Sequence, residues 1–71
     1  IDAFEVVIVP QNEKQSDAVK DIIPNISSVK KQGGEIFIVG TFYSEDYANA
    51  VCAKYISLGL FTNALKVKIE S

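Results

Sequence analysis

No set of side chains in this sequence predicts a catalytic centre. Histidine is absent, and with it the commonest general base and neutral metal ligand. Glu45 and Asp46 are adjacent and would point about 100° apart on a helix, so they suit its positive end better than the opposed carboxylates of a glycosidase. Gly33 and Gly34 lack a following Lys-Ser/Thr, which favours a hairpin turn over a phosphate loop. We therefore predict a protein that is not an enzyme and uses no metal or cofactor.

The length and the charge of the chain narrow the possible classes of protein and of partner further. A chain of 71 residues has room for one domain, and 48% hydrophobic with 23% charged residues is typical of a globular fold. No apolar run reaches the roughly 20 residues of a membrane-spanning helix, so we expect no membrane insertion by this domain. The net charge is −2 and all seven basic residues are Lys. Nucleic acid is therefore not an expected partner, because the bidentate contacts of Arg are absent.

Two single residues bear on the origin and chemistry of the chain. Cys52 is the only cysteine, which excludes an internal disulfide, and its apolar neighbours at helical spacing predict a buried structural thiol. The chain begins at Ile1 rather than Met. We interpret residues 1–71 as one domain excised from a longer protein.

The first part of the chain predicts a strand and a short helix. Residues 4–9 are β-branched and aromatic, and Pro10 ends them because it cannot donate to a ladder. Residues 17–23 have helical apolar spacing, with Ser16 expected as the N-cap and Pro24 as the stop. The first part of the chain is therefore predicted to form a strand followed by a helix.

The remaining elements complete an α+β pattern. Residues 26–31 and 35–42 predict two strands joined by a tight turn that contains Gly33 and Gly34. A helix is expected between Ser44 as N-cap and Gly59, and residues 65–70 alternate as a last strand. The order βαββαβ predicts a ferredoxin-like fold, with a four-stranded antiparallel sheet and both helices on one face. The strands at 4–9 and 35–42 should be central.

Alternation along the strands predicts which side chains form the open face of the sheet. Phe4, Val6 and Ile8 should pack under the helices with Phe37 and Val39. The residues expected to face outward or to rim that face are Glu5, Val7, Val9, Ile36, Ile38, Lys66, Lys68 and Glu70. Gln11, Asn12 and Tyr43 are candidate loop contacts, the Tyr43 ring for stacking on a sugar.

The centre of the predicted face is aliphatic, which bears on its partner. Aliphatic side chains give sugar hydroxyls no hydrogen-bond partner. Such a patch favours a protein partner, a second copy of the chain or a neighbouring domain. Ile36 and Ile38 stand where an RNA-binding sheet would need aromatic rings to stack bases.

The second half of the chain resembles the SPOR domain family, the sporulation-related repeat modules of bacterial envelope proteins. The resemblance runs from Gly34 to Ile69, half the chain. Its residues are an apolar strand entering Val39-Gly40-Thr41-Phe42, then Ser44, Ala48, Val51, Tyr55 and Leu58-Gly59, and a last strand after Phe61-Thr62-Asn63.

The resemblance carries expectations about function and location. It implies that the open sheet face binds peptidoglycan, in particular glycan strands stripped of stem peptides. It further implies a module on the periplasmic side of the bacterial cell envelope, which places its parent protein at the division septum or other sites of wall remodelling. A homodimer or another protein partner stays open beside the glycan.

Overall fold

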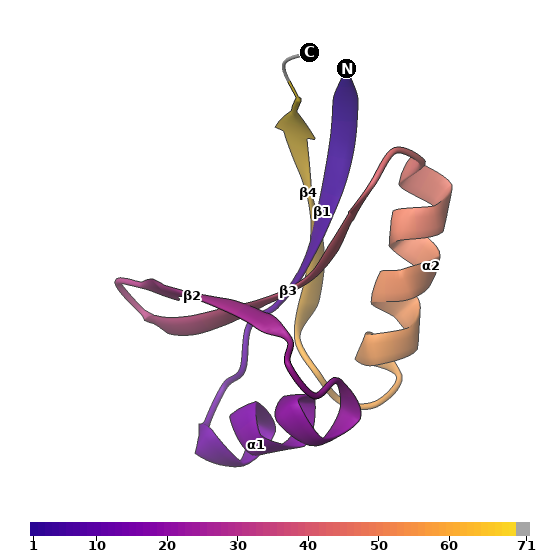
Figure 1. Ribbon diagram of the computed structural model, residues 1–71. Helices are drawn as coiled ribbons and strands as arrows, with labels where there is room; N and C mark the ends of the chain where they lie inside the picture. Colours follow the sequence, from indigo (N-terminus) through magenta and orange to yellow (C-terminus); the bar gives the residue numbers. More distant parts are fainter. Residues whose placement is uncertain (70–71) are drawn as a thin grey trace.

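The computed structural model describes residues 1–69 and shows the predicted α+β fold (Figure 1). Its elements follow one another as β1 (Asp2–Ile8), α1 (Glu13–Ile22), β2 (Ser27–Lys31), β3 (Gly34–Phe42), α2 (Glu45–Ile56) and β4 (Thr62–Lys68). None of the described helices is long and apolar enough to cross a membrane. The ferredoxin-like order βαββαβ is confirmed.

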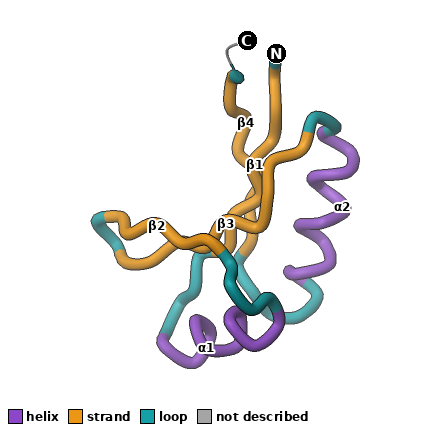
Figure 2. Tube along the Cα trace, in the orientation of Figure 1, coloured by secondary structure: helices purple, strands orange, loops and turns teal. Residues whose placement is uncertain are grey.

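The four strands form one antiparallel sheet in the order β2-β3-β1-β4. The two strongest apolar strands, β1 and β3, are therefore central, as predicted. β2 and β3 form a hairpin that extends away from the rest of the sheet, and β4 runs beside β1 (Figure 2). The hairpin turn has its positive φ at Gly34 (128°), where a residue without a Cβ avoids steric strain.

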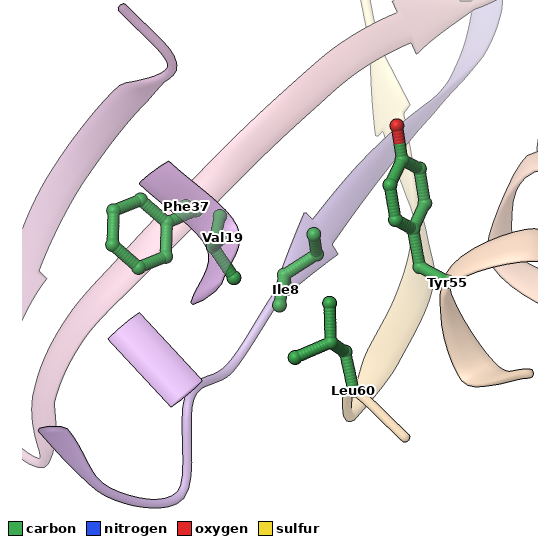
Figure 3. Packing of buried hydrophobic residues seen from close by; sticks show 5 residues of the cluster. All are labelled: Ile8, Val19, Phe37, Tyr55 and Leu60. Carbon is green, nitrogen blue, oxygen red and sulfur yellow. The ribbon is translucent and has the colours of Figure 1, made fainter. Parts of the chain in front are cut away.

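Both helices cover the same side of the sheet. Five residues from β1, α1, β3, α2 and the segment before β4 form one buried cluster: Ile8, Val19, Phe37, Tyr55 and Leu60 (Figure 3). A second cluster joins Val6 of β1 to Ala48 and Cys52 of α2. Because each cluster unites strand and helix residues, the hydrophobic core lies between this side of the sheet and the helices.

A β-bulge in β3 adjusts which residues reach that core. Val6 pairs with Gly40 and Val7 with Ile38, so Val39 is the extra residue. The extra residue resets the alternation and lets both Val39 and Phe42 pack on the helix side. A Cβ added to Gly40 would lie 3.2 Å from Cζ of Phe42. The Gly-x-Phe spacing thus has a structural role, because the missing side chain leaves room for the ring.

Several predicted boundaries shift. β1 begins two residues before the predicted start, at Asp2, and β4 begins at Thr62 rather than at 65. The early start of β4 has a simple cause, since its first residues pair with the end of β1: Thr62 lies opposite Ile8. Glu70, expected at the rim of the face, lies outside the described residues.

The start of α1 corrects the predicted N-cap. Asn12, not Ser16, is the N-cap, and its Oδ1 accepts a hydrogen bond from the backbone N–H of Gln15 at 2.9 Å. Ser16 lies inside the helix. Both residues are of a capping type, but Asn12 satisfies an orphan N–H one turn earlier and lengthens the helix.

The capping residue is testable by two alanine variants of α1. Asn12→Ala should lower the free energy of unfolding by about 1 kcal/mol, because it removes the side chain that caps the helix. Ser16→Ala should leave stability unchanged or slightly raised, because alanine is the better residue inside a helix. Urea unfolding followed by circular dichroism measures both. The reverse order of effects would contradict the assignment of Asn12 as the cap.

Cys52 is buried on α2 among Val6 and Ala48, in agreement with the predicted structural thiol. Burial raises the pKa of the Cys52 thiol, because desolvation disfavours the thiolate. The folded state therefore holds the neutral thiol more tightly than the unfolded chain does. That contribution to stability is present below the unfolded pKa and is lost as pH rises through the folded pKa, in the alkaline range.

The same burial predicts a slow reaction of Cys52. At pH 8, alkylation by iodoacetamide should be at least about 100-fold slower in the folded protein than in urea, because the native thiol must be exposed by opening and forms little thiolate. Mass spectrometry of timed samples gives both rates. Similar rates in the two conditions would show that Cys52 is accessible and would contradict its place in the core.

Candidate binding surface

The strand pairing defines the residues on the side of the sheet away from the helices. Cross-strand partners share a face, and alternate residues of one strand point to opposite faces. Starting from Val7, the pairs Val7–Ile38, Val7–Asn63 and Glu5–Thr41 identify that side. The same alternation and pairing extend this side to β2, where Ser27 lies opposite Ile38 and Val29 opposite Ile36. We call this side the open face; its residues are Ala3, Glu5, Val7, Ser27, Val29, Lys31, Ile36, Ile38, Thr41, Asn63, Leu65 and Val67.

Burial varies across the open face. Val7 is only 5% exposed although both helices lie on the other side, because it sits in a central strand between Ile38 and Asn63. Ile36 and Ile38 are half-buried, and Leu65 on the edge strand is 47% exposed. The accessible centre of the face is therefore aliphatic, as the sequence predicted.

Polar groups border this aliphatic centre. Thr41 and Asn63 are exposed, and the half-buried Glu5 lies between Thr41 and Leu65 in the register. Of these three residues, only Glu5 was predicted from the sequence. Thr41 reaches the open face only because the bulge shifts the alternation of β3, and Asn63 only because β4 begins at Thr62.

The two lysines of β4 do not border the open face, which corrects the prediction. Lys66 lies opposite Phe4, which packs against the core on the helix side, and its Nζ is 3.5 Å from Oδ2 of Asp2. Lys68 has the same parity and lies opposite Asp2. Strand alternation therefore places Leu65 and Val67 on the open face instead.

A pocket of about 300 Å³ lies at one end of the sheet, between the β1–α1 connection and the β2–β3 hairpin. We call it the hairpin pocket. Val9, Pro10 and Ile36 supply apolar wall, and the polar lining is Gln11, Asn12, Ser16, Lys31 and Glu35. The predicted residues Gln11 and Asn12 thus meet the predicted residues Val9 and Ile36 at one site. Ile36 joins the pocket to the open face.

Local hydrogen bonds fix the shape of this pocket. The Gln11 side-chain amide donates to the carbonyl of Val9 at 3.0 Å, and the Gln11 backbone N–H donates to Oε1 of Gln15 at 2.9 Å. Asn12 is held by its role as helix cap. Sequence reasoning missed Ser16, Lys31 and Glu35, since only the folded chain brings α1 and the hairpin to the β1–α1 connection.

Tyr43 lies at the opposite end of β3 from the pocket. Tyr43 and Tyr47 are 68% and 59% exposed, and the Tyr47 ring packs on Phe42 with centroids 5.1 Å apart. Thr41, Phe42 and these two tyrosines line a shallow hollow with Ser44. Ile36 and Phe42 are six positions apart along the extended strand β3, which corresponds to roughly 20 Å. The structure therefore does not bring Tyr43 together with Gln11 and Asn12.

The part of the chain that the structure describes offers no metal site. Within residues 1–69, no three His, Cys, Asp or Glu side chains lie close enough to hold a metal ion. Comparisons with protein-family models, with curated proteins and with solved structures found no match to this chain.

Proposed function

We propose that this chain is a noncatalytic binding module that takes up a glycan strand of peptidoglycan on its open face and so places its parent protein on the bacterial cell wall. The observation that carries the proposal is the arrangement of the two helices on one side, which leaves a four-stranded sheet free on the other. The resemblance of residues 34–69 to SPOR modules supports the choice of glycan and of the periplasmic side of the envelope.

The composition of the open face is compatible with an uncharged sugar chain. Ile38 and Leu65 offer apolar surface to the C–H faces of sugar rings, but alone they would leave hydroxyl groups without partners at a cost in free energy. Glu5, Thr41 and Asn63 border that surface and supply the missing donors and acceptors. An apolar floor with a few polar groups at its border is the usual composition of a ligand site.

The proposal is tested by sedimentation with purified wall sacculi. The domain should pellet with sacculi whose stem peptides an amidase has removed, and much less with untreated sacculi. Leu65→Gln should weaken binding roughly 5- to 30-fold, since burying a leucine contributes about 1–2 kcal/mol. Lys68→Gln places the same new residue on the other side of β4 and should change binding little. A parent domain that stays in solution with stripped sacculi would overturn the proposal.

A second candidate function is self-association through the same face. The observation that favours it is the aliphatic surface of Ile36, Ile38, Leu65 and Val67, which resembles the apolar centre of a protein interface.

Light scattering tests self-association directly. The parent should have the mass of a dimer, and Ile38→Lys should have the mass of a monomer, because an unpaired ammonium in the contact is costly. The mass of a monomer for both proteins, at concentrations up to the millimolar range, would contradict self-association.

A further inference from the structure

We infer that the hairpin pocket binds the acetamido group of an N-acetylated sugar, and so selects acetylated over deacetylated glycan. This inference rests on the proposed function. Beyond that function, we name the chemical group that is recognised and the residues that bind this group.

The position of the pocket suits a glycan that lies on the open face. Ile36 belongs to both surfaces, and Val9, beside it in the lining, continues β1 through a hydrogen bond from its N–H to the carbonyl of Phe61. A chain of sugars along the open face therefore meets the pocket at the end of the sheet. The volume of about 300 Å³ lies at the lower limit of small-ligand sites.

Donors remain available in the polar lining. The side-chain Oδ1 of Asn12 accepts the hydrogen bond that caps α1, so the Nδ2 group of the same side chain can still donate. Lys31 forms no ion pair with another residue between 1 and 69, and its ammonium is a second donor. A ligand carbonyl in the pocket thus finds two candidate partners from different elements.

Acceptors are present as well. The Gln11 amide nitrogen is engaged with Val9, which leaves its carbonyl oxygen to accept from a ligand N–H. Glu35 lines the same pocket, and its Oε1 is 3.9 Å from Nζ of Lys20 on α1. Lys31 and Glu35 bring opposite charges, so the lining does not favour a strongly anionic or cationic ligand.

An acetamido group matches this combination. Its carbonyl requires a donor, its N–H requires an acceptor, and its methyl requires an apolar wall such as Val9, Pro10 and Ile36. Deacetylation removes the methyl and the carbonyl, so the apolar wall and the two donors lose their partners, while the new ammonium lies among the opposite charges of Lys31 and Glu35 and gains little. The lining should therefore reject a deacetylated sugar.

Calorimetry with two oligosaccharides tests the inference. The probes are a β-1,4-linked tetramer of N-acetylglucosamine and the same tetramer after chemical deacetylation. The acetylated tetramer should bind at least roughly tenfold more tightly. Its binding should also move the amide signals of Gly33 and Gly34, which line the pocket.

Three variants locate the binding. Lys31→Met should weaken binding of the acetylated tetramer on the order of threefold to tenfold, and Asn12→Asp should do the same while it keeps the oxygen that caps α1. Lys30→Met is the matched control, because Lys30 is the next lysine on β2 and does not line the pocket. It should leave binding unchanged.

The outcomes separate this inference from the proposed function. Equal affinity for the two tetramers, or full affinity in both pocket variants, would overturn the role of the pocket and leave sacculus binding in place. Binding to stripped sacculi without binding to the acetylated tetramer would overturn it too. If the parent binds neither the tetramer nor the sacculi, the proposed function itself is overturned.

Discussion

Phe37→Ala should lower the free energy of unfolding by about 3–5 kcal/mol, the usual range for deletion of a buried aromatic ring. Phe37 is 1% exposed and joins β3 to Ile8 and Val19 in the larger cluster (Figure 3). A domain of this length has a total stability of roughly 4–11 kcal/mol. The variant should therefore be partly or wholly unfolded at 25 °C, as circular dichroism and urea titration would show.

The neighbouring residue of β3 supplies the control. Ile36→Ala removes apolar side-chain atoms from the open face, where the residue is half-buried, and should cost about 1 kcal/mol. The contrast between adjacent positions reports which side of the sheet is the core. A larger loss for Ile36→Ala than for Phe37→Ala would mean that the helices cover the other side.

Val19→Ala should have the second largest effect, a loss of about 2 kcal/mol concentrated in α1. Val19 is the only residue of α1 that is buried, so its methyl groups provide the main attachment of this helix to the sheet. The loss corresponds to roughly 30-fold faster amide hydrogen exchange if α1 opens by itself. The β1–β3 amides should change much less.

Lys20→Ala is the matched variant for α1. Lys20 is exposed; its Nζ lies 3.9 Å from Oε1 of Glu35 in a surface ion pair and 5.9 Å from the centroid of the Phe37 ring. Its replacement should therefore cost no more than about 1 kcal/mol. Equal acceleration of exchange in α1 and in the sheet of Val19→Ala would contradict the separate opening of α1. If α1 does open, the hairpin pocket loses its Ser16 wall.

Hydrophobic alternation was enough to predict the fold and the main part of the open face. The apolar runs around Ile8 and Phe37 identified the two central strands, and the capping role of Ser44 and the end of α2 near Gly59, whose φ is 87°, were also predicted correctly. These features are local, since each depends on residue type and on spacing within one segment.

The missed features depend on pairing between segments. The lysines of β4 were predicted on the wrong face, because alternation divides a strand into two sets of residues without saying which set faces the core. The cross-strand partner of Lys66 is Phe4, which packs on the helix side, and this pairing identifies the face. The bulge at Val39 and the early start of β4 likewise follow from register. The N-cap was misplaced because Asn12 and Ser16 are both of a capping type.

Methyl NMR tests most directly whether the open face is the binding surface. Two residue types occur on both sides of the sheet, with Ile38 and Leu65 on the open face and Ile8 and Leu60 in the core under the helices. Titration with stripped glycan strands should shift the methyl signals of Ile38 and Leu65 and leave those of Ile8 and Leu60 in place. Shifts confined to Ile8 and Leu60, or none at saturating glycan, would contradict the proposal that this chain binds glycan on its open face.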